Sequence, residues 1–223
     1  DASYGVIRFD WPAVAYEITE REDELVISTA ELHLRIWKRP LRFDFFDRGA
    51  NLLSRDHKAV GALANADGFE NVLLSRRVDP DESLYGLGER VSTKLRLNGM
   101  SIDNWNRDSY NSEQGMRYKS HSLYYSTRGY GVFVDNPSRM TFEVDNAAFP
   151  DLVEADGHAG EMDYYFLYGP EFRKILSRYT ELTGGAYLPP KWALGYQQCR
   201  WAYETQARVE EIAQGRVWSR TDA

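Results

Sequence analysis

The sequence predicts a mainly β protein with antiparallel sheets, followed by one strand and one helix. Apolar residues alternate with other residues from 32 to 36 and again from 41 to 46, on either side of Lys38-Arg39-Pro40. The stretch 184–190 then holds two adjacent glycines and Pro189-Pro190. Because glycine ends helices and a proline pair continues neither a helix nor a sheet ladder, this stretch predicts a boundary between a β domain, residues 1–184, and a second segment, residues 185–223.

Further strands follow from short apolar runs bounded by turn residues. Arg21-Glu22-Asp23-Glu24 is typical of a solvated hairpin tip, and Asn136-Pro137-Ser138 predicts a hairpin-like turn between its two neighbouring strands. The predicted strands in this part of the chain are 123–126, 131–135, 140–144 and 162–167.

Two helices are predicted near the C-terminal end. After Gly169-Pro170 the apolar residues fall on one helical stripe that runs to the glycine pair, with Pro170 suited to the first turn. Beyond the boundary, residues 192–196 predict a short buried strand, and Thr205 is a candidate N-cap. The helix that follows has an apolar face with Val209, Ile212 and Ala213, and its period is lost over 214–223.

Residues 98–120 show neither the strand period nor the helix period. This polar stretch carries Trp105, Arg107, Asp108 and Tyr110. Long loops of this kind inside compact domains are usually either functional or disordered, and the aromatic residues favour an ordered, functional loop. Upstream, Gly86 and Gly88 lack the spacing of a phosphate-binding loop and are typical of close backbone approach within a sheet.

Composition and charge exclude several classes of function. The net charge of −7, without a basic cluster, argues against nucleic-acid and anionic-membrane partners, and no run of about 18 apolar residues predicts a membrane span. Four scattered histidines and one cysteine show no metal-ligand spacing, so neither a metal nor another cofactor is expected. The single cysteine favours a cytoplasmic location. The 15 Tyr, 10 Phe and 6 Trp suit a β-sandwich core and also suit sugar binding.

Three motifs together resemble glycoside hydrolase family 31, the α-glucosidase family. They are Leu84-Tyr-Gly-Leu-Gly-Glu-Arg90, then Asp103-Asn-Trp-Asn-Arg-Asp108, then Leu188-Pro-Pro-Lys-Trp-Ala-Leu-Gly-Tyr-Gln-Gln-Cys-Arg-Trp-Ala-Tyr203. Their order and spacing, with Tyr-Thr-Glu-Leu-Thr-Gly at 179–184, extend the resemblance over most of the chain. It implies a galactose-mutarotase-like antiparallel β-sandwich followed by the truncated first strand–helix unit of a (β/α)8 barrel.

The resemblance also implies where a sugar is bound. Asp108 matches the loop aspartate that contacts the sugar in the family, and a carboxylate can accept hydrogen bonds from neighbouring hydroxyls. Trp201 matches the aromatic residue after the first barrel strand, at the end of the barrel where sites lie. Arg107 belongs to the same substrate-binding loop and is expected chiefly to shape it.

No catalytic residue is expected in this chain, because the family's nucleophile and acid/base are aspartates on later barrel strands. The parent protein is expected to hydrolyse α-glucosides or α-linked oligosaccharides with retention, with the rest of the barrel as the partner of this chain. The 223 residues alone are expected to be inactive. Two alternatives remain open: a non-catalytic carbohydrate-binding sandwich that uses the 105–110 loop, and an α-xylosidase-type member of the same family.

Overall fold

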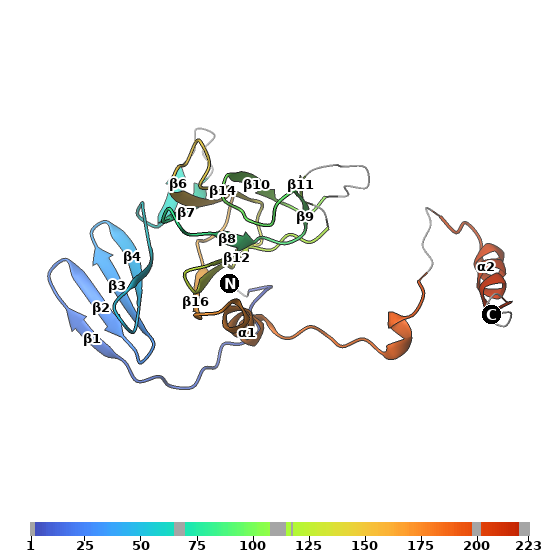
Figure 1. The fold of residues 1–223 in the computed structure, drawn as a ribbon, viewed down its shortest axis with the longest axis horizontal. Helices are drawn as coiled ribbons and strands as arrows, with labels where there is room; N and C mark the ends of the chain where they lie inside the picture. Colours follow the sequence, from blue (N-terminus) through green and yellow to red (C-terminus); the bar gives the residue numbers. More distant parts are fainter. Residues whose placement is uncertain (1–2, 65–69, 108–114, 117, 198–201, 219–223) are drawn as a thin grey trace. The chain divides into compact units, whose positions relative to one another are not determined.

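The computed structural model describes residues 3–64, 70–107, 115–116, 118–197 and 202–218. It divides the chain into two compact units, Asp1–Gly185 and Ala186–Ala223, which are described separately below. The first unit consists almost entirely of antiparallel strands with one helix, and the second contains two helical segments (Figure 1).

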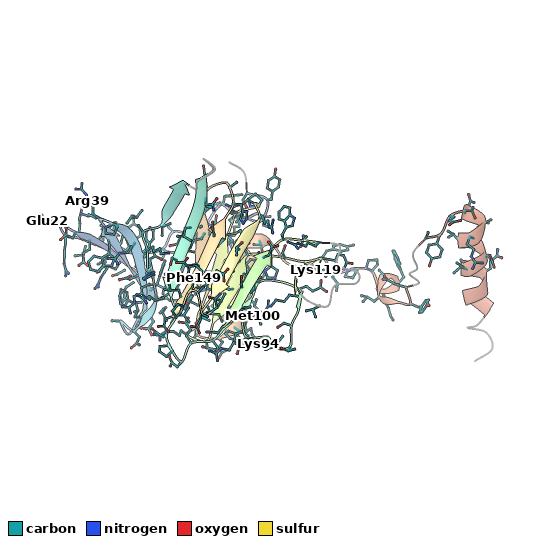
Figure 2. All side chains as sticks on the ribbon, turned by 90° about the horizontal axis from the view of Figure 1, so that it is seen from above. Glu22, Arg39, Lys94, Met100, Lys119 and Phe149 are labelled. Atoms are coloured by element: carbon teal, nitrogen blue, oxygen red, sulfur yellow. The ribbon has the colours of Figure 1, made fainter. Side chains whose placement is uncertain are left out.

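The first sheet is an antiparallel meander in which each strand pairs with the next along the chain. The predicted break at Lys38-Arg39-Pro40 is the turn between its third and fourth strands, and the charged tip at Arg21–Asp23 joins the first two. Figure 2 shows Glu22 and Arg39 at the outer ends of these two turns. The strands are β1 (Glu17–Glu20), β2 (Glu24–Ser28), β3 (Leu32–Lys38), β4 (Leu41–Asp47) and β5 (Leu52–Arg55).

Two further sheets form the sandwich. One has the order β10-β14-β15-β7-β6, and its strands are Met100–Asn104, Met140–Val144, Leu152–Gly157, Glu70–Arg77 and Gly61–Ala64. The other has the order β16-β13-β12-β8, and its strands are Tyr164–Tyr168, Tyr130–Val134, Leu123–Ser126 and Leu84–Gly86. A separate short pair joins β9 (Arg90–Val91) to β11 (Gly115–Met116).

The main core lies between these two sheets. Phe142 and Val144 of β14 face it from one side, and Tyr130 and Val132 of β13 face it from the other. Every residue of β13 is buried. The reason is that alternate residues of this strand point to opposite faces, and the second face is covered as well.

Helix α1 (Phe172–Thr183) covers that second face of the β16-β13-β12-β8 sheet (Figure 1). Ile175 and Leu182 of the helix are buried against Leu123 and Phe133 of the sheet. The helix ends where the sequence predicts, because Gly184 takes a left-handed φ of 91° and its N–H donates to the carbonyl of Thr180. Pro170 lies two residues before the first residue of the helix, Phe172, so the prediction that it belongs to the first turn is wrong.

The connection Asn136-Pro137-Ser138 is not a hairpin turn. It joins β13 of one sheet to β14 of the other, and the two strands do not pair. The amide of Asn136 fixes the crossing, donating to the carbonyls of Ala159 and Glu161 at 2.8 and 3.0 Å. The turn residues therefore predicted the end of a strand correctly, but they did not predict that the next strand belongs to the other sheet.

Gly86 and Gly88 allow the close backbone approach that the sequence predicts. Gly86 has a φ of 118° and Gly88 a φ of 81°. A Cβ atom would lie 2.4 Å from the carbonyl oxygen of Leu123 at the first position and 2.1 Å from that of Lys119 at the second. No side chain fits at these distances, so both positions require glycine.

The second unit differs from the prediction at two points. Residues 191–194 form a 3-10 helix, η1 (Lys191–Leu194), instead of a buried strand, and Trp192 is 82% exposed. A strand needs a paired neighbour, and none pairs with this segment among the described residues. Helix α2 (Gln206–Trp218) begins with the predicted cap, where the Thr205 hydroxyl accepts from the N–H of Arg208 at 3.2 Å. It continues five residues past Ala213, where the apolar period stops.

A buried ion pair joins the meander to the sandwich. Arg76 of β7 is 0% exposed and donates to the Asp56 carboxylate at 2.7 Å and to the Ser54 hydroxyl at 2.9 Å. Asp56 also accepts from the N–H of Phe43 at 2.7 Å. Nearby, the ring of Phe45 stacks on that of Phe166 with a centroid distance of 3.8 Å. Phe45 belongs to the meander, Phe166 to the β16-β13-β12-β8 sheet and Arg76 to the β10-β14-β15-β7-β6 sheet, so the charge pair lies beside aromatic rings where the three sheets meet.

Arg76→Ala leaves the Asp56 carboxylate buried without its partner, and we expect a loss of about 3–5 kcal/mol in the free energy of unfolding. Urea denaturation measures this loss. The double variant Asp56→Ala/Arg76→Ala should lose less than the sum of the two single variants, because the single variants each leave one group unpaired. Lys38→Ala, which removes two exposed contacts, an ion pair with Glu20 and a hydrogen bond to the carbonyl of Arg21, is the control. Additive losses would contradict this account.

Candidate functional site

The predicted substrate-binding stretch begins on a strand. The sequence predicts no regular structure for residues 98–120. In the structure, β10 (Met100–Asn104) occupies the first part of this stretch and pairs with β14. Ile102 lies opposite Phe142 and is buried in the main core, which explains why this polar segment forms a strand. The Trp105-Asn106-Arg107 segment therefore leaves the sandwich directly from a core strand.

Asp103 holds the start of this loop in place through two arginines. The guanidinium of Arg139 donates to both carboxylate oxygens of Asp103, from Nε at 2.7 Å and from a terminal nitrogen at 2.8 Å. Arg107 donates to the same carboxylate. The hydrogen bonds from Arg139, together with the charges of Arg139 and Arg107, hold the pKa of Asp103 below its usual range. The bidentate geometry fixes direction as well as distance.

Asn106 joins the two ends of the loop. Its side-chain oxygen accepts from the N–H of Ser120 at 2.6 Å and from the Ser120 hydroxyl at 2.8 Å. The two residues are 14 positions apart in the sequence. Residues 106 and 120 are thus held together, beside Asp103 and the two arginines that bind it.

Of the three predicted substrate-binding residues, Arg107 is described and lies exposed at this point. Asp108 and Trp201 lie outside the described residues. Their predicted contacts with sugar therefore stay predictions.

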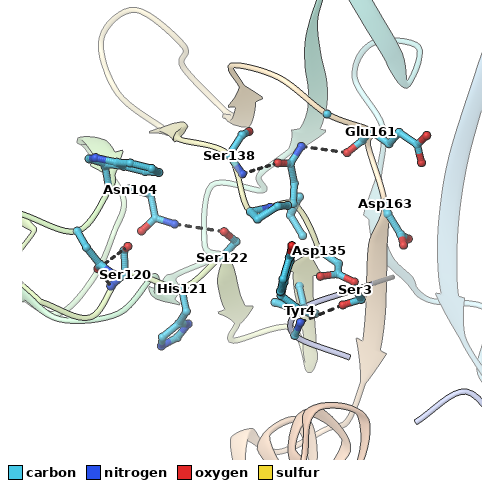
Figure 3. Close-up of a pocket in the computed structure, with 18 of the residues that line it drawn as sticks. Ser3, Tyr4, Asn104, Ser120, His121, Ser122, Asp135, Ser138, Glu161 and Asp163 are labelled. Atoms are coloured by element: carbon cyan, nitrogen blue, oxygen red, sulfur yellow. Dashed lines mark hydrogen bonds between the residues drawn. The ribbon is translucent and has the colours of Figure 1, made fainter. Parts of the chain in front are cut away.

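A cavity of about 1040 Å3 lies next to the loop ends and is built entirely from the first unit. Figure 3 shows Asn104, Ser120, His121 and Ser122 on one side of it, and Ser3, Tyr4, Asp135, Glu161 and Asp163 on the other. Trp105, Phe133 and Tyr179 add aromatic surface.

The charged groups that the described residues contribute to this cavity are all carboxylates, which are hydrogen-bond acceptors. Burial raises the pKa of the Asp163 carboxyl, and the nearby charges of Asp135 and Glu161 raise it further. Desolvation lowers the pKa of His121, so this imidazole is neutral at pH 7. Neither Lys nor Arg appears among the described residues that line the cavity. The arrangement suits a ligand that donates several hydrogen bonds.

Metal binding finds no support in the described part of the chain, where no group of three or more His, Cys, Asp or Glu side chains is placed to hold an ion. None of the described helices is long and apolar enough to cross a membrane.

Comparison with known families assigns the chain. The model of the glycosyl hydrolase 31 N-terminal galactose mutarotase-like domain matches residues 1–143. The model of the glycosyl hydrolases family 31 TIM-barrel domain matches residues 186–216. The chain therefore belongs to glycoside hydrolase family 31. Its fold is a mutarotase-like antiparallel β-sandwich followed by the start of a TIM-barrel domain, as the resemblance implied.

Individual relatives include two activities. The chain is 36% identical to alpha-glucosidase 2 of Bacillus thermoamyloliquefaciens, over 88% of its own length and 25% of the relative. It is 35% identical to the alpha-xylosidase XylQ of Lactiplantibacillus pentosus, over 82% of its own length and 24% of the relative. The solved structure of a family 31 dextranase of Flavobacterium johnsoniae, complexed with isomaltotriose, matches with a TM-score of 0.82 and 31% identity, covering 96% of this chain and 26% of that one. The chain spans about a quarter of the length of these relatives.

Several residues at this site could not be identified from the sequence. Arg139 lies 36 positions from Asp103, and only the pairing of β10 with β14 brings them together. Asp135 and Asp163 meet because β13 pairs with β16. Acidic residues are common in this chain, so their sequence positions alone could not single these two out.

Arg139→Ala should destabilise the chain in a pH-dependent way. The pKa of Asp103 is lowered in the folded state, so its bridge stabilises the fold above the unfolded pKa of about 4 and loses this effect as pH falls through the lowered pKa. We expect the gap in urea midpoint between the wild type and this variant to be largest near pH 7 and to narrow below about pH 4.

Arg48→Ala, an exposed arginine outside every ion pair of the described residues, serves as the control. A gap for Arg139→Ala that stays constant with pH would show that the loss comes from packing and not from the Asp103 bridge.

Proposed function

We propose that this chain is the N-terminal sandwich and first barrel unit of an α-glucosidase-type enzyme that hydrolyses α-glucosidic bonds with retention. The observation that carries the proposal is membership of the family together with the sequence Trp105-Asn106-Arg107-Asp108. Within this sequence, Arg107 is held by its ion pair with Asp103, and Asn106 is held by its hydrogen bonds with Ser120. The alpha-glucosidase relative and the isomaltotriose-bound dextranase support a glucoside as substrate.

In this proposal the sandwich positions the substrate and the barrel carries the chemistry. Asp108 accepts hydrogen bonds from two neighbouring sugar hydroxyls, Trp201 lines the same subsite, and Arg107 holds the loop through Asp103. Two carboxylates about 5–5.5 Å apart, on barrel strands beyond this chain, serve as nucleophile and acid/base. We also propose that the sandwich comprises residues 1–184 and that the barrel domain starts with the linker at 185.

An α-xylosidase is the second candidate, because the xylosidase relative is nearly as similar as the glucosidase. The two substrates differ in the CH2OH group that glucose carries and xylose lacks. The sequence Asn106-Arg107-Asp108 in the loop favours glucose as the sugar of the substrate, and this preference rests only on resemblance to the family.

The parent enzyme should release p-nitrophenol faster from the α-glucoside than from the α-xyloside. Asp108→Asn should lower kcat/KM for the glucoside about 10–100-fold, because a hydrogen bond to a charged group contributes about 1.5–3 kcal/mol. Asp81→Asn, an exposed aspartate in a turn elsewhere on the sandwich, is the matched control. A preference for the xyloside would select the second candidate, and an unaffected Asp108→Asn variant would remove Asp108 from the subsite.

The 223-residue chain by itself should not hydrolyse the α-glucoside, because the proposed catalytic carboxylates lie outside it. The same p-nitrophenol assay, at high protein concentration, measures this. Release above the rate of a heat-unfolded sample would contradict the proposal.

A further inference from the structure

The 1040 Å3 cavity of the first unit lies at the upper end of the range of about 300–1,000 Å3 that is usual for small-molecule sites. Every residue that lines it belongs to the sandwich unit, and none lies in the barrel segment.

The carboxylates of this cavity have no cationic partner among the described residues. Asp135 and Asp163 lie close enough for their charges to interact, and neither forms a salt bridge with a described Lys, Arg or His. Other carboxylates of the sandwich, such as Asp56 and Asp103, each pair with arginine. The cavity thus presents hydrogen-bond acceptors that a donor-rich ligand can satisfy.

Asn104 adds a further unsatisfied acceptor. The residue lines the cavity and is only 5% exposed. Its amide nitrogen donates to the Ser122 hydroxyl at 3.2 Å, whereas its oxygen has no hydrogen-bond partner. Buried polar atoms are nearly always hydrogen-bonded in native proteins, so an orphaned oxygen at a cavity wall points to a missing donor. The oxygen is shielded from solvent, so the amide has to turn for a ligand hydroxyl to reach it.

Aromatic rings and neutral polar groups complete the lining. Trp105 lines the cavity and is 46% exposed. Tyr4 lies across the cavity from Asn104, the residue before Trp105 (Figure 3). The neutral imidazole of His121 offers one donor and one acceptor. A sugar ring uses all of these at once, since its hydroxyls both donate and accept and its C–H faces pack on aromatic rings. An ammonium or guanidinium group would use only the carboxylates and the rings.

We propose that this cavity is a sugar-binding site of the sandwich, which holds a neutral glucopyranose unit between Trp105, the first residue of the proposed substrate-binding loop, and the Asp135–Asp163 pair. The proposal takes from the proposed function only the class of sugar.

Saturation-transfer NMR and calorimetry on the 223-residue chain test the proposal, with methyl α-D-glucopyranoside and isomaltotriose as probes. We expect a dissociation constant on the order of 1 mM or tighter for isomaltotriose. Trp105→Ala and Asp163→Asn should each weaken binding about tenfold, because each removes one of the two principal contacts. Trp192→Ala, an exposed tryptophan of the second unit, and Asp81→Asn are matched controls that should leave binding unchanged.

Circular dichroism on every variant separates loss of binding from loss of folding. Absence of binding by the folded wild type at 20-fold the expected constant, about 20 mM, would overturn the proposal. So would binding that the two cavity variants leave unchanged, or binding of methylguanidinium without binding of the glucoside. If the parent enzyme hydrolyses α-glucosides and this chain binds no sugar, the cavity proposal fails and the proposed function stands. If the chain binds sugar and the parent lacks hydrolase activity, the proposed function fails and the cavity proposal stands.

Discussion

The buried pair of Arg76 and Asp56 is the interaction on which the first unit depends. Both side chains are fully buried, and a charge removed from water at this depth is tolerated only with a partner and further hydrogen bonds. Ser54 and the backbone of Phe43 supply those bonds from the meander, whereas Arg76 itself belongs to the sandwich. The pair therefore fixes the meander against β7. Stacking of Phe45 on Phe166, with ring centroids 3.8 Å apart, adds a contact between the meander and the third sheet, which contains β16.

The same rule of charge pairing orders the segment around Asp103, at the start of the predicted substrate-binding loop. Asp103 binds Arg139 and Arg107, and Asn106 closes the loop onto Ser120, so the polar groups beside the motif are largely satisfied within the sandwich. The neighbouring cavity differs. Its carboxylates lack cations among the described residues, and an amide oxygen at its wall has no partner. The cavity therefore presents hydrogen-bond acceptors that a ligand with hydrogen-bond donors can satisfy.

Strands and helices with a strong local signal could be predicted from the sequence. The strands at 123–126 and 140–144 have their predicted ends, and α1 stops at the predicted glycine. The prediction failed where a neighbour decides the conformation. Residues 100–104 are polar enough for a loop, yet they form a strand because β14 offers hydrogen-bond partners and a core for Ile102. Residues 192–196 are apolar enough for a strand, yet 191–194 form a 3-10 helix because no described strand pairs with them.

Period-two patterning and the glycine and proline boundary predicted a mainly β chain, because both reflect local backbone preference. The three motifs resembled glycoside hydrolase family 31, and the family model confirmed that membership. The folded structure was needed to show which strands share a sheet, that Asn136-Pro137-Ser138 crosses between sheets, and which acidic residues meet. Asp135 and Asp163 share a cavity because β13 pairs with β16, and Asp103 reaches Arg139 across β10 and β14. Such contacts depend on chain segments far apart in sequence, and no local pattern encodes them.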